Sequence, residues 1–422
     1  MATSIVPKPY AIPTPVKQGF LMLTGRGFKR GFTRDLWLLL GEMFSRRLVM
    51  GFLEVVRPIY LSLIGFSPLQ VGLILTTGTL VSAIDSLVLG SLSDRYGRKP
   101  FILFGSISST LRLVLYALSR DFWVLVIAQG IGAIGEGVGA GQPIVSGYIA
   151  DKTEASDRPH VFSVLAISSA LSTAIGSLMA CLPAYFQVSL HLDEVGSNVF
   201  LFYIGTVLNG LAVVFALPLK ESRRTREAQR DRPVTKLSWR AVSTFCLVRA
   251  TDGLGMGLVT QLLPLYFYLR FGSGAEDLAL FYALARFLAI PTYLFAPLLA
   301  AKFGNIKCLI ISRIVTGTSI AIFAMAPSFQ TSIAFFMTYR LLFEFAMPMR
   351  QAFSTGLVEP HQTGTFLGTS NSARSFVQSL APTIAGYLFE FGSLSLPLFS
   401  GAILLAVNGV QYHIFYRKVE DL

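Results

Sequence analysis

Long apolar stretches follow one another along most of this chain, and short polar segments separate them. A helix that crosses a lipid bilayer needs about 20 mostly apolar residues. The pattern predicts twelve such helices, at residues 36–64, 68–92, 99–118, 122–149, 160–187, 198–218, 239–268, 276–301, 306–326, 330–356, 362–390 and 395–416. Strands of a membrane barrel would alternate apolar and polar positions over about 10 residues, a pattern that we do not find. The chain is therefore predicted to be an all-α membrane protein with twelve transmembrane helices.

Two polar, basic segments divide this pattern into parts. We expect an N-terminal segment at 1–34, a six-helix bundle at 35–218, a linker at 219–238, a second six-helix bundle at 239–416 and a tail at 417–422. A cleavable signal peptide is not expected, because the first apolar run starts late and no small-residue cleavage pattern follows it.

The net charge of +12 would suit a nucleic-acid partner, so the positions of the charges decide its meaning. If successive loops lie on alternate sides, 23 Lys and Arg residues fall on one side and two, Arg120 and Arg270, on the other. Basic loops stay in the cytoplasm. We therefore predict a multi-pass protein of the cell membrane with both termini cytoplasmic and no nucleic-acid partner. The stretch 17–34, basic with interleaved Phe, is either a contact with the inner leaflet or a solvated tail.

The composition argues against a soluble enzyme. Charged residues make up 14% of the chain, against roughly 25% in soluble proteins. Cys181, Cys246 and Cys308 are scattered in apolar runs, which fits neither a disulfide framework nor a zinc site. The glycines at 130, 132 and 135 match a dinucleotide fingerprint by letter but follow no strand. We expect no enzymatic activity, no metal and no cofactor.

The two halves of the chain resemble each other at a nearly constant offset. Pro58-Ile59-Tyr60 matches Pro264-Leu265-Tyr266, and Glu136 matches Glu344. Two related six-helix bundles are typical of secondary transporters, which hold the substrate between them near the middle of the membrane.

The segment Gly90-x-Leu92-x-Asp94-Arg95-x-Gly97-Arg98-Lys99 lies between the second and third predicted helices. Gly97 suits a tight turn there, because glycine tolerates positive φ. The segment resembles the signature loop of the major facilitator superfamily (MFS), and with the spans and the repeat the resemblance covers the whole chain. It implies the MFS fold, with Asp94 and Arg98 helping to lock the halves together on the cytoplasmic side and Asp151 as the acidic partner.

Three departures from the family pattern qualify this resemblance. In the second copy of the loop Ala301 and Asn305 replace Asp94 and Arg98, so we expect a weaker lock in that half. Val126 stands where the family's fourth helix carries an Arg. The Gly-Pro pattern of drug/proton antiporters is missing at 174–177. The last two departures weaken an assignment to that antiporter group.

Charges within the predicted helices carry the functional information, because each costs roughly 2.5–3.5 kcal/mol at the bilayer centre. Of ten Arg and six acidic residues, eleven lie on helices 1, 4, 7 and 10, which in the resembled family line the central cavity. A buried carboxyl that binds and releases a proton can couple transport to a proton gradient. The candidates, with Glu136 first, are Glu136, Glu54, Asp85, Asp252 and Glu344.

Helical spacing predicts four local ion pairs: Glu42–Arg46, Glu54–Arg57, Arg249–Asp252 and Arg340–Glu344. We expect Arg47, Arg313 and Arg350 to extend toward the membrane surface or to pair. The surplus of Arg would suit an anionic or zwitterionic solute, since Arg binds carboxylate and phosphate through two parallel hydrogen bonds. The candidates for the substrate cavity are Arg57, Arg112, Arg249, Arg286, Arg340, Arg374, Tyr60 and Tyr266.

Together these features predict a secondary active transporter, a monomer in the bilayer, that moves a small organic solute by alternating access, coupled to protons and possibly in the direction of export. The alternative among transporters is a carrier or exchanger of organic anions. A receptor or scaffold on the same fold would be a different class of function, but such a protein has little reason to retain buried charges.

Overall fold

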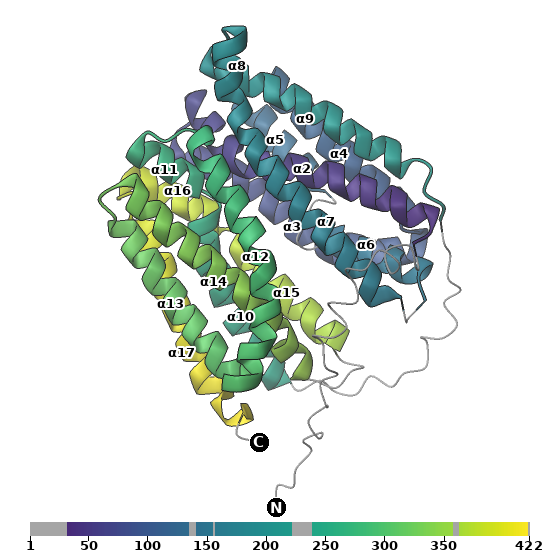
Figure 1. Ribbon diagram of the computed structural model, residues 1–422, viewed down its shortest axis with the longest axis vertical. Coiled ribbons are helices and arrows are strands. Elements are labelled where there is room, and N and C mark those ends of the chain that lie inside the picture. The colour runs from purple at the N-terminus through teal and green to yellow at the C-terminus, as the bar shows by residue number, and fades with distance from the viewer. Residues whose placement is uncertain (1–31, 135–140, 155–156, 222–238, 358–362, 421–422) are drawn as a thin grey trace, which may run out of the picture.

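The computed structural model describes residues 32–134, 141–154, 157–221, 239–357 and 363–420, and these form helices without any strand (Figure 1). The helices are α2 (Arg34–Leu63), α3 (Pro68–Tyr96), α4 (Lys99–Leu118), α5 (Phe122–Ala133), α6 (Gly141–Lys152), α7 (Arg158–Leu178), the short η1 (Met179–Cys181), α8 (Leu182–Leu190), α9 (Glu194–Ala216), α10 (Trp239–Thr260), α11 (Leu263–Phe271), α12 (Ala275–Phe303), α13 (Asn305–Met325), α14 (Phe329–Gly356), α15 (Thr363–Ser379), α16 (Ala381–Phe391) and α17 (Leu396–Glu420). The all-α prediction is confirmed.

Proline explains why three predicted helices are interrupted. New helices begin just before Pro183, Pro264 and Pro382, each of which occupies the first turn. Proline has no N–H to donate and its ring clashes with the preceding turn, so it suits a helix start better than a helix interior. The predicted spans 160–187, 239–268 and 362–390 therefore each contain a break near one end.

Within the part of the chain that the structure describes, seven helical segments are long and apolar enough to cross a membrane by themselves: Pro68–Asp85, Lys99–Leu118, His160–Leu190, Glu194–Ala216, Val242–Phe271, Asn305–Met325 and Leu396–Tyr416. Helices α2, α12 and α14 are not among them, and these three carry Glu54, Arg286 and Arg340. Glu54, Arg286 and Arg340 thus lie on helices outside this group, whereas Asp252 and Arg313 lie on two of its members, α10 and α13.

The hydrophobic cores show how the two halves of the molecule meet. One core contains residues of both halves, such as Leu53 and Ile74 with Met256 and Ala385. Two further cores each belong to one half, around Tyr148 in the first and around residues 242–245 in the second. We call the end with α8, α11 and α16 the joined end, and the opposite end, with the α3–α4 and α12–α13 turns, the parted end (Figure 1).

Close backbone contacts hold the two halves at the joined end. A Cβ on Gly72 of α3 would lie 2.3 Å from the carbonyl oxygen of Pro382, and one on Gly386 of α16 would lie 2.3 Å from that of Pro68. The Thr383 N–H and hydroxyl both donate to Thr76 Oγ1, at 3.0 and 2.7 Å. Glycine at both positions lets α3 and α16 approach more closely than side chains would permit.

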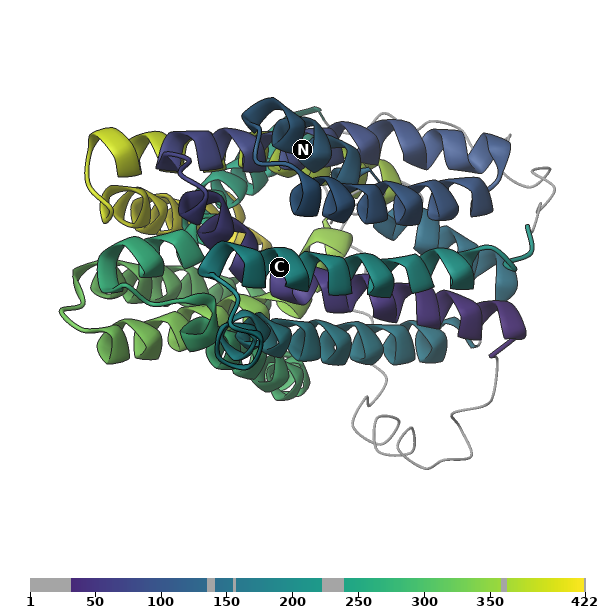
Figure 2. The same ribbon diagram turned by 90° about the horizontal axis from the view of Figure 1, so that it is seen from above.

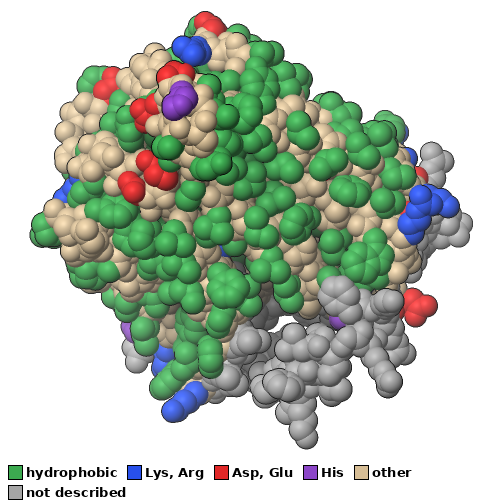
Figure 3. Space-filling view, turned by 45° about the horizontal axis from the view of Figure 1, so that its top comes forward, with side chains coloured by type: hydrophobic (Ala, Val, Ile, Leu, Met, Phe, Trp, Pro, Cys, Tyr) green, Lys and Arg blue, Asp and Glu red, His purple; other side chains and the backbone are tan. Residues whose placement is uncertain are grey.

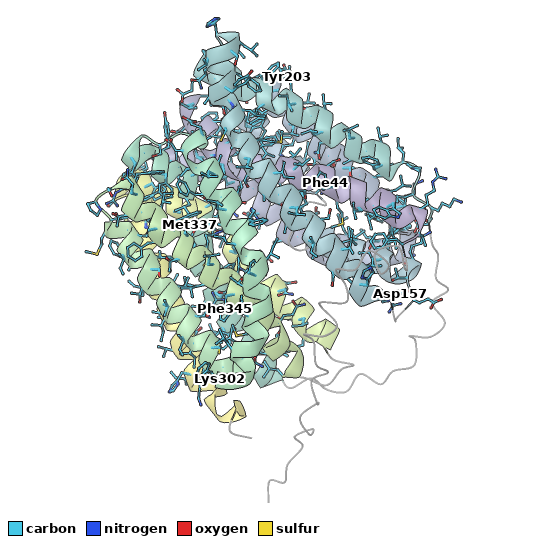
Figure 4. All side chains as sticks on the ribbon, viewed as in Figure 1. Phe44, Asp157, Tyr203, Lys302, Met337 and Phe345 are labelled. Atoms are coloured by element: carbon cyan, nitrogen blue, oxygen red, sulfur yellow. The ribbon has the colours of Figure 1, made fainter. Side chains whose placement is uncertain are left out.

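The surface agrees with a protein that lies in lipid. Apolar side chains cover most of the face in Figure 3, and charged side chains gather near its two ends. Figure 2 shows α2 and α9 side by side within the first half, and the two helices are packed together. Asp157 of the first half and Lys302 of the second both lie at the parted end in Figure 4.

Candidate substrate and coupling site

Glu54 of α2 forms ion pairs with two arginines of the other half. Its carboxylate contacts Arg286 of α12, and Arg340 Nη2 of α14 lies 3.7 Å from Glu54 Oε1. The side chains of Glu54 and Arg286 are 29% and 25% exposed, whereas that of Arg340 is 10% exposed. The cluster therefore joins the halves and remains open to a small solute or to water.

The described ion pairs of Glu54 join it to arginines that its spacing did not predict. Glu54 contacts Arg286 and Arg340, both of the other half. Arg57 Nη1 donates to Gln129 Oε1 of α5 at 3.2 Å. Spacing along one helix gives no information on a partner from another helix, so the sequence could not predict these contacts, and the pairs Glu54–Arg57 and Arg340–Glu344 stay predictions.

Gln129 connects Arg57 to a buried polar network of the first half. The hydroxyl of Tyr116 donates to Gln129 Oε1 at 3.1 Å, and the hydroxyl of Tyr60 donates to the carbonyl of Tyr116 at 3.2 Å. These bonds fix the position of Arg57 beside Glu54. The sequence pointed to no role for Gln129 in the site, so this connection was missed.

A second cluster of charges surrounds Asp252 of α10. Its Oδ1 lies 2.8 Å from Arg313 Nη2, and its Oδ2 lies 2.9 Å from Arg350 Nη1, 3.0 Å from Arg374 Nε and 4.0 Å from Arg249 Nη1. Four helices, α10, α13, α14 and α15, thus bring arginines to one carboxylate. We call Asp252 and these four arginines the Asp252 cluster.

The Asp252 cluster decides between the two expectations for Arg313 and Arg350, which pair with Asp252 rather than extend toward the membrane surface. Both are buried and lie over the ring of Phe343 as they reach Asp252. Arg249 is near Asp252, as its spacing predicts, but its closest described bond is to Asn371 Oδ1, at 2.5 Å. Buried carboxylates are usually paired; the sequence predicted Arg249 as the partner of Asp252, but the arginines from other helices could not be inferred from spacing.

Three candidates for the substrate cavity lie elsewhere. Tyr60 and Tyr266 are fully buried, and Tyr266 packs among Phe267, Phe323 and other rings while accepting a hydrogen bond from Arg270. Arg112 of α4 is buried against α5, where a Cβ on Gly132 would lie 2.4 Å from Arg112 Cδ. In this conformation these three side chains lie in the packed core, so their place in a substrate cavity stays a prediction.

The signature loop forms a compact ionic unit at the parted end. Arg98 Nε lies 3.1 Å from Asp151 Oδ2 of α6. Gly97 has φ of 96°, as expected of a tight turn. Glu221, which follows α9, accepts from the N–H groups of Arg98 and Lys99 at 3.0 and 2.9 Å. Glu221 thereby caps α4, whose first N–H groups lack partners within the helix.

The remaining candidates can be placed only in part. Glu136, the first choice for proton coupling, lies outside the described residues. Gly90 and Asp94 lie on α3, but their surroundings are not described. Arg95 is exposed beside the ring of Tyr96. Asp85 and Glu344 are half-buried on α3 and α14.

Comparison with known proteins identifies the family to which a chain with this fold and these charge clusters belongs. The family model described as Major Facilitator Superfamily matches residues 39–382. The chain belongs to the Major Facilitator Superfamily. An uncharacterised membrane protein of Saccharomyces cerevisiae is 20% identical over 415 residues, which are 89% of this chain and 93% of the yeast protein.

Two further relatives extend this picture of the MFS chain. The quinolone resistance protein NorA of Staphylococcus aureus is 22% identical over 405 residues, covering 92% of this chain and all of NorA. A crystal structure of the nucleoside transporter NupG superposes with a TM-score of 0.70 at 15% identity, over 91% of this chain and all of the NupG chain. NupG supports the fold alone, at this level of identity.

In this MFS member the two clusters offer different chemistry. The Glu54 cluster, Glu54 with Arg286 and Arg340, is partly exposed and links the two halves. The Asp252 cluster lies within the second half, with Asp252 and Arg313 almost fully buried. In it four guanidinium groups meet one carboxylate, so positive charge is in excess.

Proposed function

We propose that the protein is a secondary active transporter that moves a small organic solute across the cell membrane by alternating access and in exchange or symport with protons. In this proposal the twelve predicted helices all cross the membrane, the bundles 35–218 and 239–416 rock against each other, and both termini are cytoplasmic. The parted end is then the cytoplasmic end.

The ion pairs of Glu54 with Arg286 and Arg340 are the observation that supports this proposal most directly. While Glu54 is ionised, its charge draws α12 and α14 toward α2. Protonation removes that charge, so the two arginines are released and the halves can separate there. A carboxyl at this position thus links proton binding to the relative position of the halves.

Competition for Arg286 would couple the solute to the proton. An anionic or dipolar solute that binds Arg286 displaces Glu54, and the displaced carboxyl becomes free to take up a proton. Arg286 suits this role because it is a quarter exposed and presents several donors in a planar group. The sequence relationship to NorA, a quinolone resistance protein, supports export as the direction.

A carrier of organic anions is the second candidate. The excess of guanidinium groups in the Asp252 cluster favours it, because anions would balance that charge. In this version the solute is itself the anion, and Glu54 carries the proton that accompanies it.

Purified protein in liposomes with an internal pH-sensitive dye tests the proposal. A panel of a quinolone, a nucleoside, a dicarboxylate and a phosphate ester is offered with an imposed pH gradient and again after a protonophore has collapsed it. Accumulation of one solute should require the gradient. Glu54→Gln should reduce that accumulation by about tenfold or more, since one charge-assisted contact contributes about 1.5–3 kcal/mol, while exchange without a gradient continues.

Glu42→Gln is the matched control, because Glu42 is also a carboxylate of α2 but pairs with Arg46 of the same helix, at 3.1 Å. This variant should retain gradient-driven accumulation. Accumulation by Glu54→Gln at the wild-type rate under the gradient would contradict the proposal.

A further inference from the structure

The charges of the Asp252 cluster do not balance. Asp252 is the one carboxylate within 4.0 Å of the four arginines among the described ion pairs. Three positive charges therefore remain without a described counter-charge in a largely buried site.

Polar groups of the cluster also lack partners. Arg313 is fully buried, yet its Nε and Nη1 have no hydrogen-bond partner in the described part of the chain. Buried guanidinium donors normally have acceptors. The unsatisfied donors and the excess charge both indicate that an anion completes this site.

The accessible edge of the cluster is formed by Arg249 and Arg374, whose side chains are 14% and 12% exposed. Asn371, which accepts from Arg249, is exposed one turn before Arg374 on α15. An anion can thus approach along α15, while Arg350 and Arg313 lie deeper and contribute charge.

We infer that the Asp252 cluster is a binding site for the carboxylate or phosphate group of a soluble anion. The inference rests on the proposed function, since the anion is taken to be part of the transported solute. Arg249 and Arg374 bind the anionic oxygens directly, and Asp252 holds the four guanidinium groups together when the site is empty.

Thermal unfolding of the detergent-purified protein tests this site. Inorganic phosphate and citrate are compared with chloride at equal pH and ionic strength. Binding should raise the midpoint temperature in a saturable way, as for any ligand of the native state. Arg249→Gln and Arg374→Gln should each weaken the apparent affinity by about tenfold, whereas Arg374→Lys should keep part of it.

Arg46→Gln is the matched control, because the Arg46 side chain is also 12% exposed and paired with a carboxylate, in the other half. It should show the wild-type response. Phosphate also stabilises proteins by being excluded from their surface, and that effect would persist in all variants. An increment that persists in both Arg249→Gln and Arg374→Gln would therefore overturn the inference.

A lipid headgroup offers the same phosphate chemistry, so the assay is repeated with phosphatidylglycerol and phosphatidylcholine in place of soluble anions. Stabilisation by phosphatidylglycerol alone would overturn the assignment to a soluble anion. The test is independent of transport: unchanged accumulation by Glu54→Gln would count against proton coupling and leave this site standing, while a lack of anion response would count against the site only.

Discussion

Arg98 reaches Asp151 only because residue 147 is a glycine. A Cβ at Gly147 would lie 0.8 Å from Arg98 Nη1, so the guanidinium group of Arg98 occupies the space that a side chain on α6 would take. The Arg98–Asp151 ion pair thus depends on a residue one turn away from Asp151, on the same helix.

Gly147→Ala should abolish the Arg98–Asp151 contact at little cost in stability. The displaced group is the end of a flexible side chain, and a partly exposed ion pair contributes about 0–1 kcal/mol. With the three cysteines replaced by Ser, spin labels at Asp157→Cys and Lys302→Cys report the distance across the parted end. Arg98 and Asp151 both belong to the first half, so their contact acts on the second half only by positioning the signature loop. If the loop helps to hold the halves together, as the family resemblance implies, the distances should become longer, by the same amount as in Asp151→Asn.

The double variant Gly147→Ala/Asp151→Asn should shift the distances no further than either change alone, since both remove one contact. Additive shifts would contradict this account. Gly210→Ala on α9 is the control, because a Cβ there meets nothing within 4 Å.

Gly386→Ala should open the joined end. The added Cβ would meet the backbone oxygen of Pro68, which cannot move away as a side chain can. Overpacking of this kind costs about 1–3 kcal/mol, and the cost falls only on the conformation with a closed joined end. The distance between labels at residues 157 and 302 should shorten as the halves rock, whereas Gly368→Ala, with open space around its Cβ, should leave it unchanged.

Removing the Glu54–Arg286 pair should alter both the distribution of distances between labels at residues 157 and 302 and the free energy of unfolding. A double-mutant cycle of Glu54→Gln and Arg286→Gln should give a coupling free energy of about 1–2 kcal/mol, below that of a fully buried pair because both side chains are partly exposed. The Glu42–Arg46 pair lies within one helix. Breaking the Glu42–Arg46 pair should change the unfolding midpoint but not the distance between labels at residues 157 and 302. If it shifts that distance as much as the loss of the Glu54–Arg286 pair does, the Glu54–Arg286 pair does not link the halves.

Asp252→Asn should destabilise the protein by about 3–5 kcal/mol, because it leaves four buried guanidinium groups without their carboxylate. Arg374→Gln should then act with opposite signs in two backgrounds. It should destabilise the wild type and stabilise Asp252→Asn, where it removes a repelling charge. Unfolding in detergent measures both, and the same sign in both backgrounds would show that Asp252 is not the hub of the cluster.

The sequence was sufficient for features that local physics determines. The apolar runs predicted the helices because lipid requires about 20 apolar residues in a row, and Gly97 predicted a turn because glycine tolerates positive φ. Arg98 and Asp151 were expected to meet through the family resemblance, and they are in contact.

Partners across the fold were not predictable. Glu54 and Arg57 have the spacing of a helical pair, yet the partner of Glu54 is Arg286, 232 residues away. Tyr266 was placed on a cavity helix by its position in the chain, but the face that a helix turns inward depends on packing, which put Tyr266 among phenylalanine rings. Arg313 and Arg350 looked unpaired because Asp252, their common partner, belongs to another helix.

The two ends of the molecule close by different forces. Salt should therefore affect the closing of the parted end and have little effect on the joined end. The joined end closes through apolar packing and neutral hydrogen bonds, such as that of Thr76 with Thr383, which ions hardly affect. The parted end carries basic residues on both halves, among them Lys99 and Lys152, which pairs with Asp35, on the first half and Lys302 on the second. Closing it brings like charges together, and about 0.1 M salt already screens them beyond about 10 Å. If the parted end is cytoplasmic, as proposed, a change in the ionic strength of the cytoplasm would change the relative populations of the conformations with the parted end open and closed, without any ligand.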